Sequence, residues 1–341
     1  MGVVVTGIGM MGDWGAGKDA FLSFLAGRSV PVAVEDFDFD AYIDTQLVRR
    51  ADHISRCALT ASTLALRDAD LSIDRNASQR IGVVFGTVHG ALHYTIDYHA
   101  SLVTGDPKVA SPLLFSDSVP NAPVSHISTS LGIQGYTITT QGYCAVTQAV
   151  EVASQLISHG TLDVCLVGGA DVNHELLAKF YIGCLRSPDD VKKTFGGSAF
   201  FVLESESHAA SRKARVYANL EAVTMITATG EVMRRSKGLF LDGVDFSGCV
   251  LAAAYDDKES TGRMATLLDG FSGHTIDCSL LFGYGFAAAE SFQIALAALG
   301  AQDSKVLAAL AKEAVCSSGW VSLLRTALSG VNSVVVFRSK A

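Results

Sequence analysis

The sequence predicts an α/β protein, because short β-branched runs alternate with amphipathic helical stretches along the chain. The apolar runs at residues 81–85 and 333–337 have the length and composition of buried strands. Residues 146–159 instead carry apolar residues at helical spacing. Hydrophobic residues make up 49% of the 341 positions and charged residues only 18%, which is enough apolar surface for a large core. We therefore expect sheets whose faces are covered by helices.

The same patterns place the remaining elements in order along the chain. Strands are expected at residues 3–7, 81–85, 164–167, 200–204 and 333–337. Helices are expected at residues 18–25, 56–69, 146–159 and 287–299. The pair Gly168-Gly169 is expected to form a turn. The Ala-rich helix at 287–299 should be buried on most of its faces, and the second half of the chain should open near Val216.

Charge and cysteine usage exclude several classes of function. The formal net charge of -8 argues against a nucleic-acid partner, because phosphate binding needs clustered Lys and Arg. Apolar stretches are interrupted before they reach spanning length and no basic leader opens the chain, so we expect no membrane association. The seven cysteines are scattered without a Cys-x-x-Cys pair, which is typical of free thiols in a reducing cytoplasm. We expect neither a bound metal nor a cofactor.

Residues 12–18 match the GxxxxGK pattern of a phosphate-binding loop. Such a loop needs Ser or Thr at the next position to hold magnesium, but this chain has Asp19, whose carboxylate would repel phosphates. We therefore interpret the segment as an ordinary Gly-rich turn between a strand and a helix.

The most informative local pattern ends at Cys144. Residues 135–141 form a β-rich run, a glycine follows, and a helix is expected to begin at about Cys144. A thiol at a helix N-terminus faces the positive end of the helix dipole, which lowers the thiol pKa and favours a nucleophilic thiolate. The alternative is that Cys144 is one of seven small, buried apolar residues, since no base lies beside it in the sequence.

A set of blocks over the first two-thirds of the chain follows one family pattern. The blocks are residues 3–9, 21–29, 111–112, 119–122, 135–144, 163–171, 201–206 and 210–215. In this order, they resemble the β-ketoacyl-ACP synthases. The resemblance implies a thiolase-like fold with duplicated halves in a layered αβαβα arrangement. It divides the chain into an N-terminal ketosynthase-like half at 1–210 and a shortened C-terminal thiolase-like half at 211–341.

The departures from the family pattern concern its catalytic groups. In the family, a Cys carries the acyl chain, while two His residues assist decarboxylation of malonyl-ACP and stabilise the developing oxyanion. At the first His motif, residues 251–259 contain no His. At the second, Ser279 replaces a Lys and Tyr284 occupies the His position. The family's Gly-Phe-Gly-Gly loop is reduced to residues 330–333.

The spacing around the elbow leaves the nucleophile position open. Counting forward from Gly135 places Cys144 there, whereas counting backward from Gly160 places Tyr143 there. Cys144 is therefore a candidate relic of the nucleophile rather than a confident catalytic residue. Of the nine histidines, His274 is nearest to the lost site, and we expect it to be exposed or otherwise satisfied.

The resemblance, together with the missing histidines, implies a non-condensing subunit. Within the family, the degenerate paralogue is the chain length factor, or ketosynthase β subunit, of type II polyketide synthases. It forms a heterodimer with an active ketosynthase and shapes the tunnel in which a chain carried by acyl carrier protein grows. We expect these two proteins as partners.

Residues 86–99 resemble the segment whose side chains gate that tunnel in chain length factors. By this match, the candidate tunnel residues are Leu92, Thr95, Tyr98 and His99. Leu92, Thr95 and either Tyr98 or His99 would lie one helical turn apart on one face. The alternative is an ordinary amphipathic helix at a dimer interface.

Two other functions stay open from the sequence. One is a self-sufficient condensing or acyl-transfer enzyme that uses Cys144 with an unrecognised base. The other is a scaffolding protein of the same fold without a polyketide role.

Overall fold

The structure is a computed structural model of the whole chain. It describes residues 1–340 with the exception of 29–35, 47, 75–76, 106–109, 178, 180–195, 242–247, 255–257, 272, 280, 284, 311–318 and 328–329.

Strands and helices alternate along the chain, as the apolar patterns predict. The strands are β1 (Val3–Gly12), β2 (Gly15–Ala16), β3 (Ile81–Thr87), β4 (Thr137–Gln141), β5 (Val164–Asp171), β6 (Gly197–Ser205), β7 (Ala218–Thr227), β8 (Cys249–Ala254), β9 (His274–Asp277), β10 (Trp320–Thr326) and β11 (Val331–Arg338). The α-helices are α1 (Lys18–Leu25), α2 (His53–Asp68), α3 (Leu92–Thr104), α4 (Pro112–Asp117), α5 (Ala122–Leu131), α6 (Ala145–Ser158), α9 (Glu206–Ser211), α10 (Gly230–Phe240), α11 (Lys258–Leu268), α12 (Phe286–Gln302) and α13 (Ser304–Ala308). Two 3-10 turns, η2 (Phe39–Ala41) and η3 (Ser78–Arg80), precede α2 and β3.

The strand order shows that the two halves of the chain repeat one topology. The hydrogen-bonded path runs β4-β3-β5-β6-β1-β7-β11-β10-β8-β9, with β2 pairing only with β1. In the first half, β4, β3 and β5 are parallel, and β6 and β1 are antiparallel to their neighbours. In the second half, β9, β8 and β10 are parallel, and β11 and β7 are antiparallel. The halves join where β1 pairs with β7. The predicted duplication is therefore confirmed.

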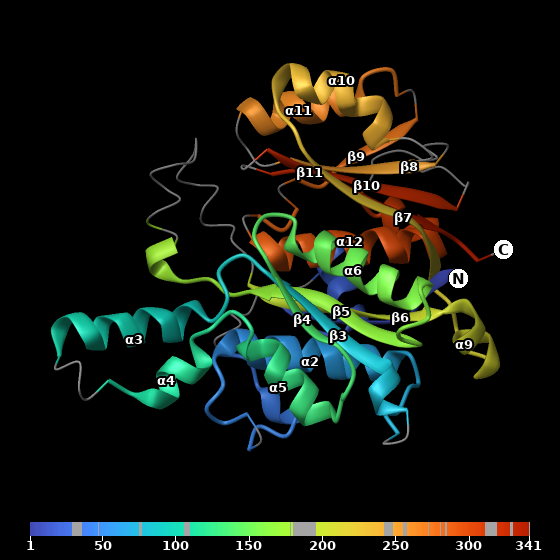
Figure 1. The fold of residues 1–341 in the computed structure, drawn as a ribbon. Coiled ribbons are helices and arrows are strands. Elements are labelled where there is room, and N and C mark those ends of the chain that lie inside the picture. The colour runs from blue at the N-terminus through green and yellow to red at the C-terminus, as the bar shows by residue number, and fades with distance from the viewer. Residues whose placement is uncertain are drawn as a thin grey trace.

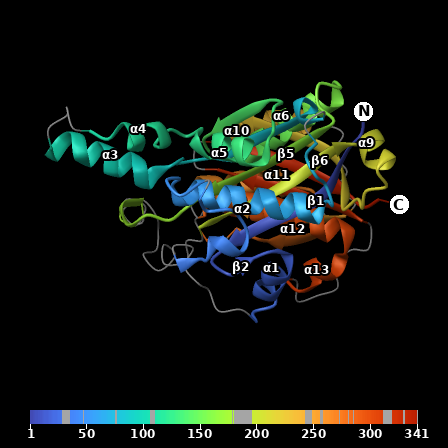
Figure 2. The same ribbon diagram turned by 90° about the horizontal axis from the view of Figure 1, so that it is seen from below.

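The elements form five layers. Figure 1 shows α6 and α12 between the two half-sheets, with α2 and α5 outside the first half-sheet and α10 and α11 outside the second. Figure 2 shows α2 lying across the molecule when it is seen from below. This is the αβαβα arrangement that the resemblance implied.

Successive side chains of a strand point to opposite faces of the sheet, so the first half-sheet has a hydrophobic core on each face. In β5, Cys165 and Val167 belong to the inner cluster with α6 and α12, whereas Val164 and Leu166 belong to the outer cluster with α2. Because both faces are covered, every residue of β5 is buried.

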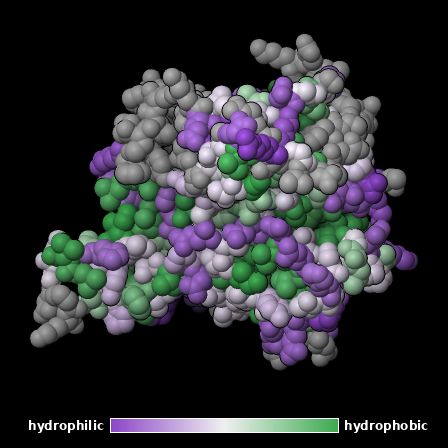
Figure 3. Space-filling view, turned by 45° about the horizontal axis from the view of Figure 1, so that its top comes forward, coloured by the Kyte–Doolittle hydropathy of each residue, from purple (hydrophilic) through white to green (hydrophobic). Residues whose placement is uncertain are grey.

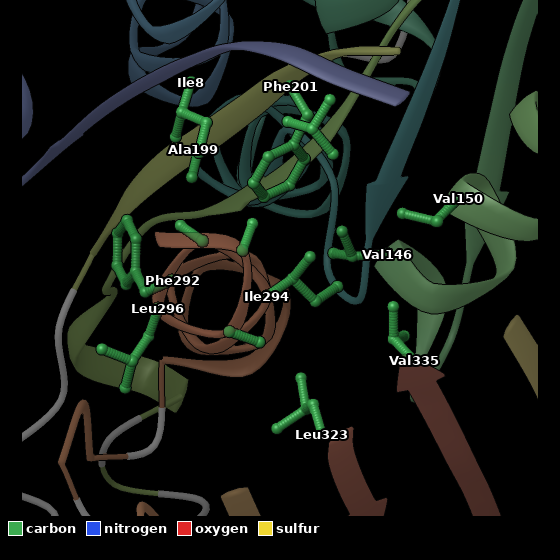
Figure 4. Packing of buried hydrophobic residues seen from close by; sticks show 14 of the residues in the cluster. Ile8, Val146, Val150, Ala199, Phe201, Phe292, Ile294, Leu296, Leu323 and Val335 are labelled. Atoms are coloured by element: carbon green, nitrogen blue, oxygen red, sulfur yellow. The ribbon is translucent and has the colours of Figure 1, made fainter. Parts of the chain in front are cut away.

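The central helix α12 is buried on all sides, as predicted for the Ala-rich segment. All its residues from Phe286 to Ala301 are buried. Figure 4 shows it end-on, with Ala199 and Phe201 on one side and Leu323 and Val335 on the other. A helix in this position needs small residues facing the two sheets, which accounts for its alanines.

Two predictions about element boundaries need correction. The helix expected from residue 56 begins at His53. The turn expected at Gly168-Gly169 is wrong, because β5 continues through both glycines to Asp171. A Cβ atom at Gly168 would lie 2.2 Å from the Ala199 carbonyl oxygen, and one at Gly169 would lie 2.4 Å from a Val146 methyl. These glycines therefore permit close packing inside the sheet rather than a turn.

Helices α3 and α4 form an arm that projects from the body of the molecule (Figures 1 and 2). No residue of α3 is buried. Val103 on α3 is 84% exposed, and Leu113 and Phe115 on α4 are 54% and 56% exposed. Figure 3 shows apolar side chains gathered on this projection at the left of the molecule. The arm therefore presents apolar side chains to its surroundings.

The boundary expected at residue 210 falls inside α9, between the strands of the two half-sheets. The division into domains at this position stays a prediction. Among the described residues, no helix combines the length and apolar character needed to cross a bilayer.

Candidate functional site

The candidate site lies where parallel strands of the first half end and α6 begins. After β4, Gly142 has a φ of 127° and Cys144 a φ of 61°. The Cys144 carbonyl oxygen accepts the first helical hydrogen bond, from Gln148 N at 3.0 Å, so Cys144 is the N-cap of α6. A side chain other than glycine in the left-handed region is uncommon and strained. The chain thus forms the predicted strand-turn-helix elbow, with Cys144 rather than Tyr143 at its corner.

The first turn of α6 is occupied by a carboxylate from α12. Glu290 accepts hydrogen bonds from Val146 N at 3.2 Å, Thr147 N at 3.0 Å and Thr147 Oγ1 at 2.7 Å. Glu290 is only 1% exposed. The unpaired N–H groups and the positive dipole end of a helix N-terminus favour an anion, so this buried carboxylate is well stabilised.

Two residues of the C-terminal hairpin complete the surroundings of Cys144. Arg325 on β10 is buried, and its Nε atom lies 3.9 Å from Glu290 Oε1. Ser333 on β11 lies with its Oγ atom 3.3 Å from Thr147 Oγ1. Residues from both halves of the chain therefore surround the elbow.

Cys144 is held as a thiol. Burial, followed by the negative charge of Glu290, raises its pKa to about 12, although Arg325 and Ser333 act in the opposite direction. At pH 7, a thiol with such a pKa is ionised in only about one molecule in 10⁵. Because the thiolate is the nucleophilic form, this elbow presents a weak nucleophile. None of the residues that act most strongly on the Cys144 pKa is a histidine.

A second buried carboxylate, Asp171 at the end of β5, connects the two halves. It accepts hydrogen bonds from Thr87 Oγ1, Val88 N and His89 N, all at 3.0 Å. It also accepts one from Ala287 N in the first turn of α12, at 3.0 Å. The loop after β3 and the start of α12 are therefore fixed to each other.

His89 also lies at this end of the sheet, two residues after the end of β3. Its Nδ1 atom is 3.6 Å from Asp171 Oδ1, and its ring meets the Phe286 ring edge-on with centroids 4.4 Å apart. The available signal in the sequence was its position shortly after the buried strand expected at residues 81–85.

The residues that the sequence places at or near the lost catalytic positions differ in where they lie in the structure. Tyr284 lies outside the described residues. Ser279, expected in place of a Lys, accepts a hydrogen bond from Ala254 N at 2.9 Å and so secures the loop after β9 to the end of β8. His274 is exposed on β9. The described part of residues 251–259 belongs to β8 and the start of α11.

The four candidate tunnel residues lie on α3, away from the elbow in sequence and on the projecting arm. The Thr95 hydroxyl donates to the carbonyl oxygens of Ala91 and Ser118. The Tyr98 ring lies 5.4 Å from the Phe115 ring on α4. Leu92 and Tyr98 are half-buried, whereas His99 is exposed. Their role in a tunnel stays a prediction.

Sequence reasoning missed the charged pair beside the elbow. Glu290 was treated as part of an apolar helix, and Arg325 lies in a strand that was not predicted. The available signal was a single charge inside each buried run, because a fully buried charge needs a partner. Among the described residues, no group of three or more His, Cys, Asp or Glu is arranged to hold a metal ion.

The duplicated five-layer fold and the cysteine elbow together define a thiolase-like protein. Residues 3–209 match the sequence model for the N-terminal domain of β-ketoacyl synthases. This match covers more than half of the chain, and the chain therefore belongs to the β-ketoacyl synthase family.

Curated relatives agree with this assignment. The chain is 30% identical over 296 residues to "Putative polyketide beta-ketoacyl synthase 1" of Streptomyces halstedii, covering 72% of this chain and 70% of that protein. The 3-oxoacyl-[acyl-carrier-protein] synthases 2 of Staphylococcus aureus are matched over only about half of their length, 49–51%.

The structural matches cover the whole fold. The ishigamide ketosynthase/chain length factor superposes with a TM-score of 0.82 at 20% identity, covering 100% of this chain and 99% of that one. A chain of a second structure superposes with a TM-score of 0.77 at 19% identity, covering 99% of this chain and 99% of that one. That structure is titled as a type II polyketide synthase acyl-carrier protein in complex with its ketosynthase bound to the hexaketide. The thiolase-like fold class is thus confirmed.

Proposed function

We propose that this chain is a non-condensing, ketosynthase-like subunit of a type II polyketide synthase. It pairs with an active ketosynthase, as a chain length factor does, and shapes the tunnel in which a polyketide or polyene chain elongates on acyl carrier protein. The observation that carries the proposal is the state of Cys144, a buried thiol beside Glu290 and Arg325 at the position where an acyl-carrying nucleophile would be needed.

The chemistry of condensation supports this proposal. An acyl-transferring cysteine must be a thiolate, and the carbon nucleophile needs groups that assist decarboxylation and stabilise an oxyanion. Here the amide donors of the first α6 turn already bind Glu290. A buried carboxylate beside the thiol opposes both a thiolate and an oxyanion. Losing such groups lowers rates by about 10² to 10³ each.

The exposed arm and the similar structures support the two partners. Apolar side chains on α3 and α4 suit burial against another protein. The similar structures include one titled as a ketosynthase/chain length factor and one that contains an acyl-carrier protein. Within this proposal, Leu92, Thr95, Tyr98 and His99 contribute to the tunnel wall. The five described cysteines are free and buried, which fits the cytoplasm as the location.

The test is co-expression of this chain, carrying the only affinity tag, with the ketosynthase of its own biosynthetic system. The expected result is a one-to-one complex that elongates malonyl-ACP and retains this activity with Cys144→Ala. Inactivating the ketosynthase subunit instead should abolish elongation.

The alternative is a self-sufficient acyl-transfer or condensing enzyme that uses Cys144, and the left-handed elbow at that residue favours it. In that case the purified chain would form a stable homodimer and acquire an acyl group on Cys144 without a second subunit. Mass spectrometry of the Cys144 peptide after incubation with an acyl-ACP distinguishes the two. An acylated peptide in the isolated chain would sink the subunit proposal.

A further inference from the structure

Three histidines from separate parts of the chain meet at the base of the arm formed by α3 and α4. His53 is the first residue of α2, His93 lies in the first turn of α3, and His174 follows β5. The ring centroids of His53 and His93 are 6.1 Å apart, and those of His93 and His174 are 4.7 Å apart. All three residues are half-buried. This histidine cluster is separate from the elbow and from the candidate tunnel residues.

The hydrogen bonds of His93 and His174 determine where each ring can accept a further proton. His174 Nδ1 lies 3.1 Å from Leu176 N, and an amide N–H can only donate, so this nitrogen is assigned no proton. His93 Nε2 lies 3.0 Å from the Asn173 carbonyl oxygen, which can only accept, so this nitrogen is assigned a proton. Protonation of His174 therefore breaks its bond with Leu176 N, whereas protonation of His93 leaves its bond with Asn173 intact.

Two features of the cluster oppose positive charge on its rings. His53 and His93 lie in the first turns of helices, whose positive dipole ends disfavour a cation. The edge-on contact of His93 with His174 would bring two imidazolium charges together in a half-buried place, where water and salt screen them weakly. Burial, and then the charge of His93, lower the pKa of His174. The fold therefore favours a neutral His174.

A buried carboxylate, Asp52, acts on the cluster in the opposite direction. Asp52 directly precedes α2, is 2% exposed, and accepts a hydrogen bond from Tyr94 N of α3 at 3.4 Å. Its Oδ1 atom is buried and accepts no hydrogen bond from the described residues. Burial raises the pKa of Asp52, whereas the charges of His93 and His53 act in the opposite direction. Asp52 therefore attracts a protonated His93 and keeps α3 on α2.

The carboxylates that face His174 compensate a charge there less well. Asp97 on α3 and Glu175 are exposed, so water weakens their attraction for His174. Glu175 also pairs with Lys179, with its Oε2 atom 3.2 Å from Nζ. Asp52 has the weakest of the influences on the pKa of His174. Among the described residues, the buried carboxylate thus favours a charge on His93 and not on His174.

We propose that the histidine cluster is a pH-sensitive latch that holds residues 173–177 on the base of the arm at neutral pH and releases them at acidic pH. Protonation of His174 breaks its bond with Leu176 N and places a positive charge against His93, while Asp52 keeps α3 in place. The latch thus couples acidity to the base of the arm that carries the exposed apolar side chains. This inference goes beyond the proposed function and requires no partner.

The experiment measures hydrogen–deuterium exchange of the full chain at pH 7.5 and pH 5.5, one unit either side of the ordinary histidine pKa of about 6.5. Mass spectrometry of peptides resolves the exchange, which is corrected for the pH dependence of free amides. We expect the protection of residues 173–177 to fall by about fivefold at pH 5.5, the factor that one typical hydrogen bond contributes. Residues 91–96, which include Tyr94 N, should keep their protection. A parallel fall in β5 would show general loosening of the fold and would overturn the inference.

His174→Asn removes the titrating group and keeps an acceptor for Leu176 N. We expect its protection at residues 173–177 to be the same at both pH values. His274→Asn is the matched control, because His274 is exposed on β9 and lies outside the cluster. It should respond to pH as the unsubstituted protein does. Asp52 still titrates in His174→Asn, so a fall in protection that persists in this variant would contradict the latch.

His93→Gln tests the contact between the two rings and keeps a donor for the Asn173 carbonyl oxygen. Without the neighbouring charge, His174 binds a proton more readily. Release of residues 173–177 should therefore begin at a higher pH than in the unsubstituted protein. An unchanged or lower pH of release would show that the two rings do not act on each other, and the latch would be wrong.

Discussion

The two central helices begin in the same way but carry different side chains at their first corner. Cys144 at the start of α6 has a φ of 61°, and Phe286 at the start of α12 has a φ of 49°. Each follows the edge strand of its half-sheet, β4 or β9. The duplicated backbone thus provides two similar elbows with different side chains at the corner, a thiol in one and a phenyl ring in the other.

Each helix N-terminus also receives a buried carboxylate, and each carboxylate comes from the other half. Glu290 of the second half binds the first turn of α6, and Asp171 of the first half binds Ala287 N of α12. Two sites suited to stabilising an anion are therefore filled from within. The two halves are therefore linked to each other at the starts of both central helices.

The connections beside the two elbows differ more than the elbows do. In the first half, residues 88–136 between β3 and β4 include α3, α4 and α5. In the second half, residues 255–273 between β8 and β9 carry α11 in their described part. The projecting apolar arm thus belongs to the first half. The two halves therefore share their sheet topology but differ in the helices that connect matching strands.

The largest expected effect comes from charging one glutamine on each central helix. Gln293 on α12 is 2% exposed and donates to the Cys278 carbonyl oxygen at 3.0 Å, whereas Gln148 on α6 is exposed. We expect Gln293→Lys to lower the free energy of unfolding by about 4 kcal/mol or more, since an uncompensated buried charge costs that much. Gln148→Lys should change it by less than about 0.5 kcal/mol. Urea denaturation measures both, and similar midpoints would contradict the burial difference between the helices.

A smaller effect is expected from truncating the two corner residues. Phe286 is 6% exposed and packs against His89, so Phe286→Ala should lower the unfolding free energy by about 3 kcal/mol. Cys144→Ala removes only a sulfur atom and should cost about 1 kcal/mol. Thermal or urea unfolding of the two variants tests this order. The reverse order would mean that the cysteine, not the phenylalanine, is the structural member of the pair.

Much of the fold could be predicted because it depends on local apolar patterns. The helix at residues 18–25 and the buried strand at 333–337 lie within observed elements, and burial of the Ala-rich helix is confirmed. The error at Gly168-Gly169 has a physical cause. Glycine marks both turns and close packing, and only the neighbouring strand and helix decide between them.

The site was predictable only in part. The elbow at Cys144 follows from a strand, a glycine and a helix that are contiguous in the chain. Its chemistry depends on Glu290, Arg325 and Ser333, which lie more than 140 residues away and arrive through the packing of α12 and the last hairpin. The spacing of apolar residues along the sequence does not reveal contacts between residues this far apart. A charge inside an apolar run indicates only that a partner exists.

The smallest expected effect concerns pH and the arm that distinguishes the halves. His174 follows β5, and its ring lies 4.7 Å from that of His93 at the base of α3. Burial, and then the charge of His93, lower the pKa of His174, although three nearby carboxylates act in the opposite direction: Glu175, Asp97 and Asp52. The unfolded chain therefore binds this proton more readily than the folded one. The contribution to stability is complete above about pH 6.5 and declines as the pH falls below it.

We expect His174→Gln to reduce the loss of unfolding free energy between pH 7 and pH 5, measured by urea denaturation at each pH. An equal loss in both proteins would show that the base of the arm does not respond to pH through this histidine.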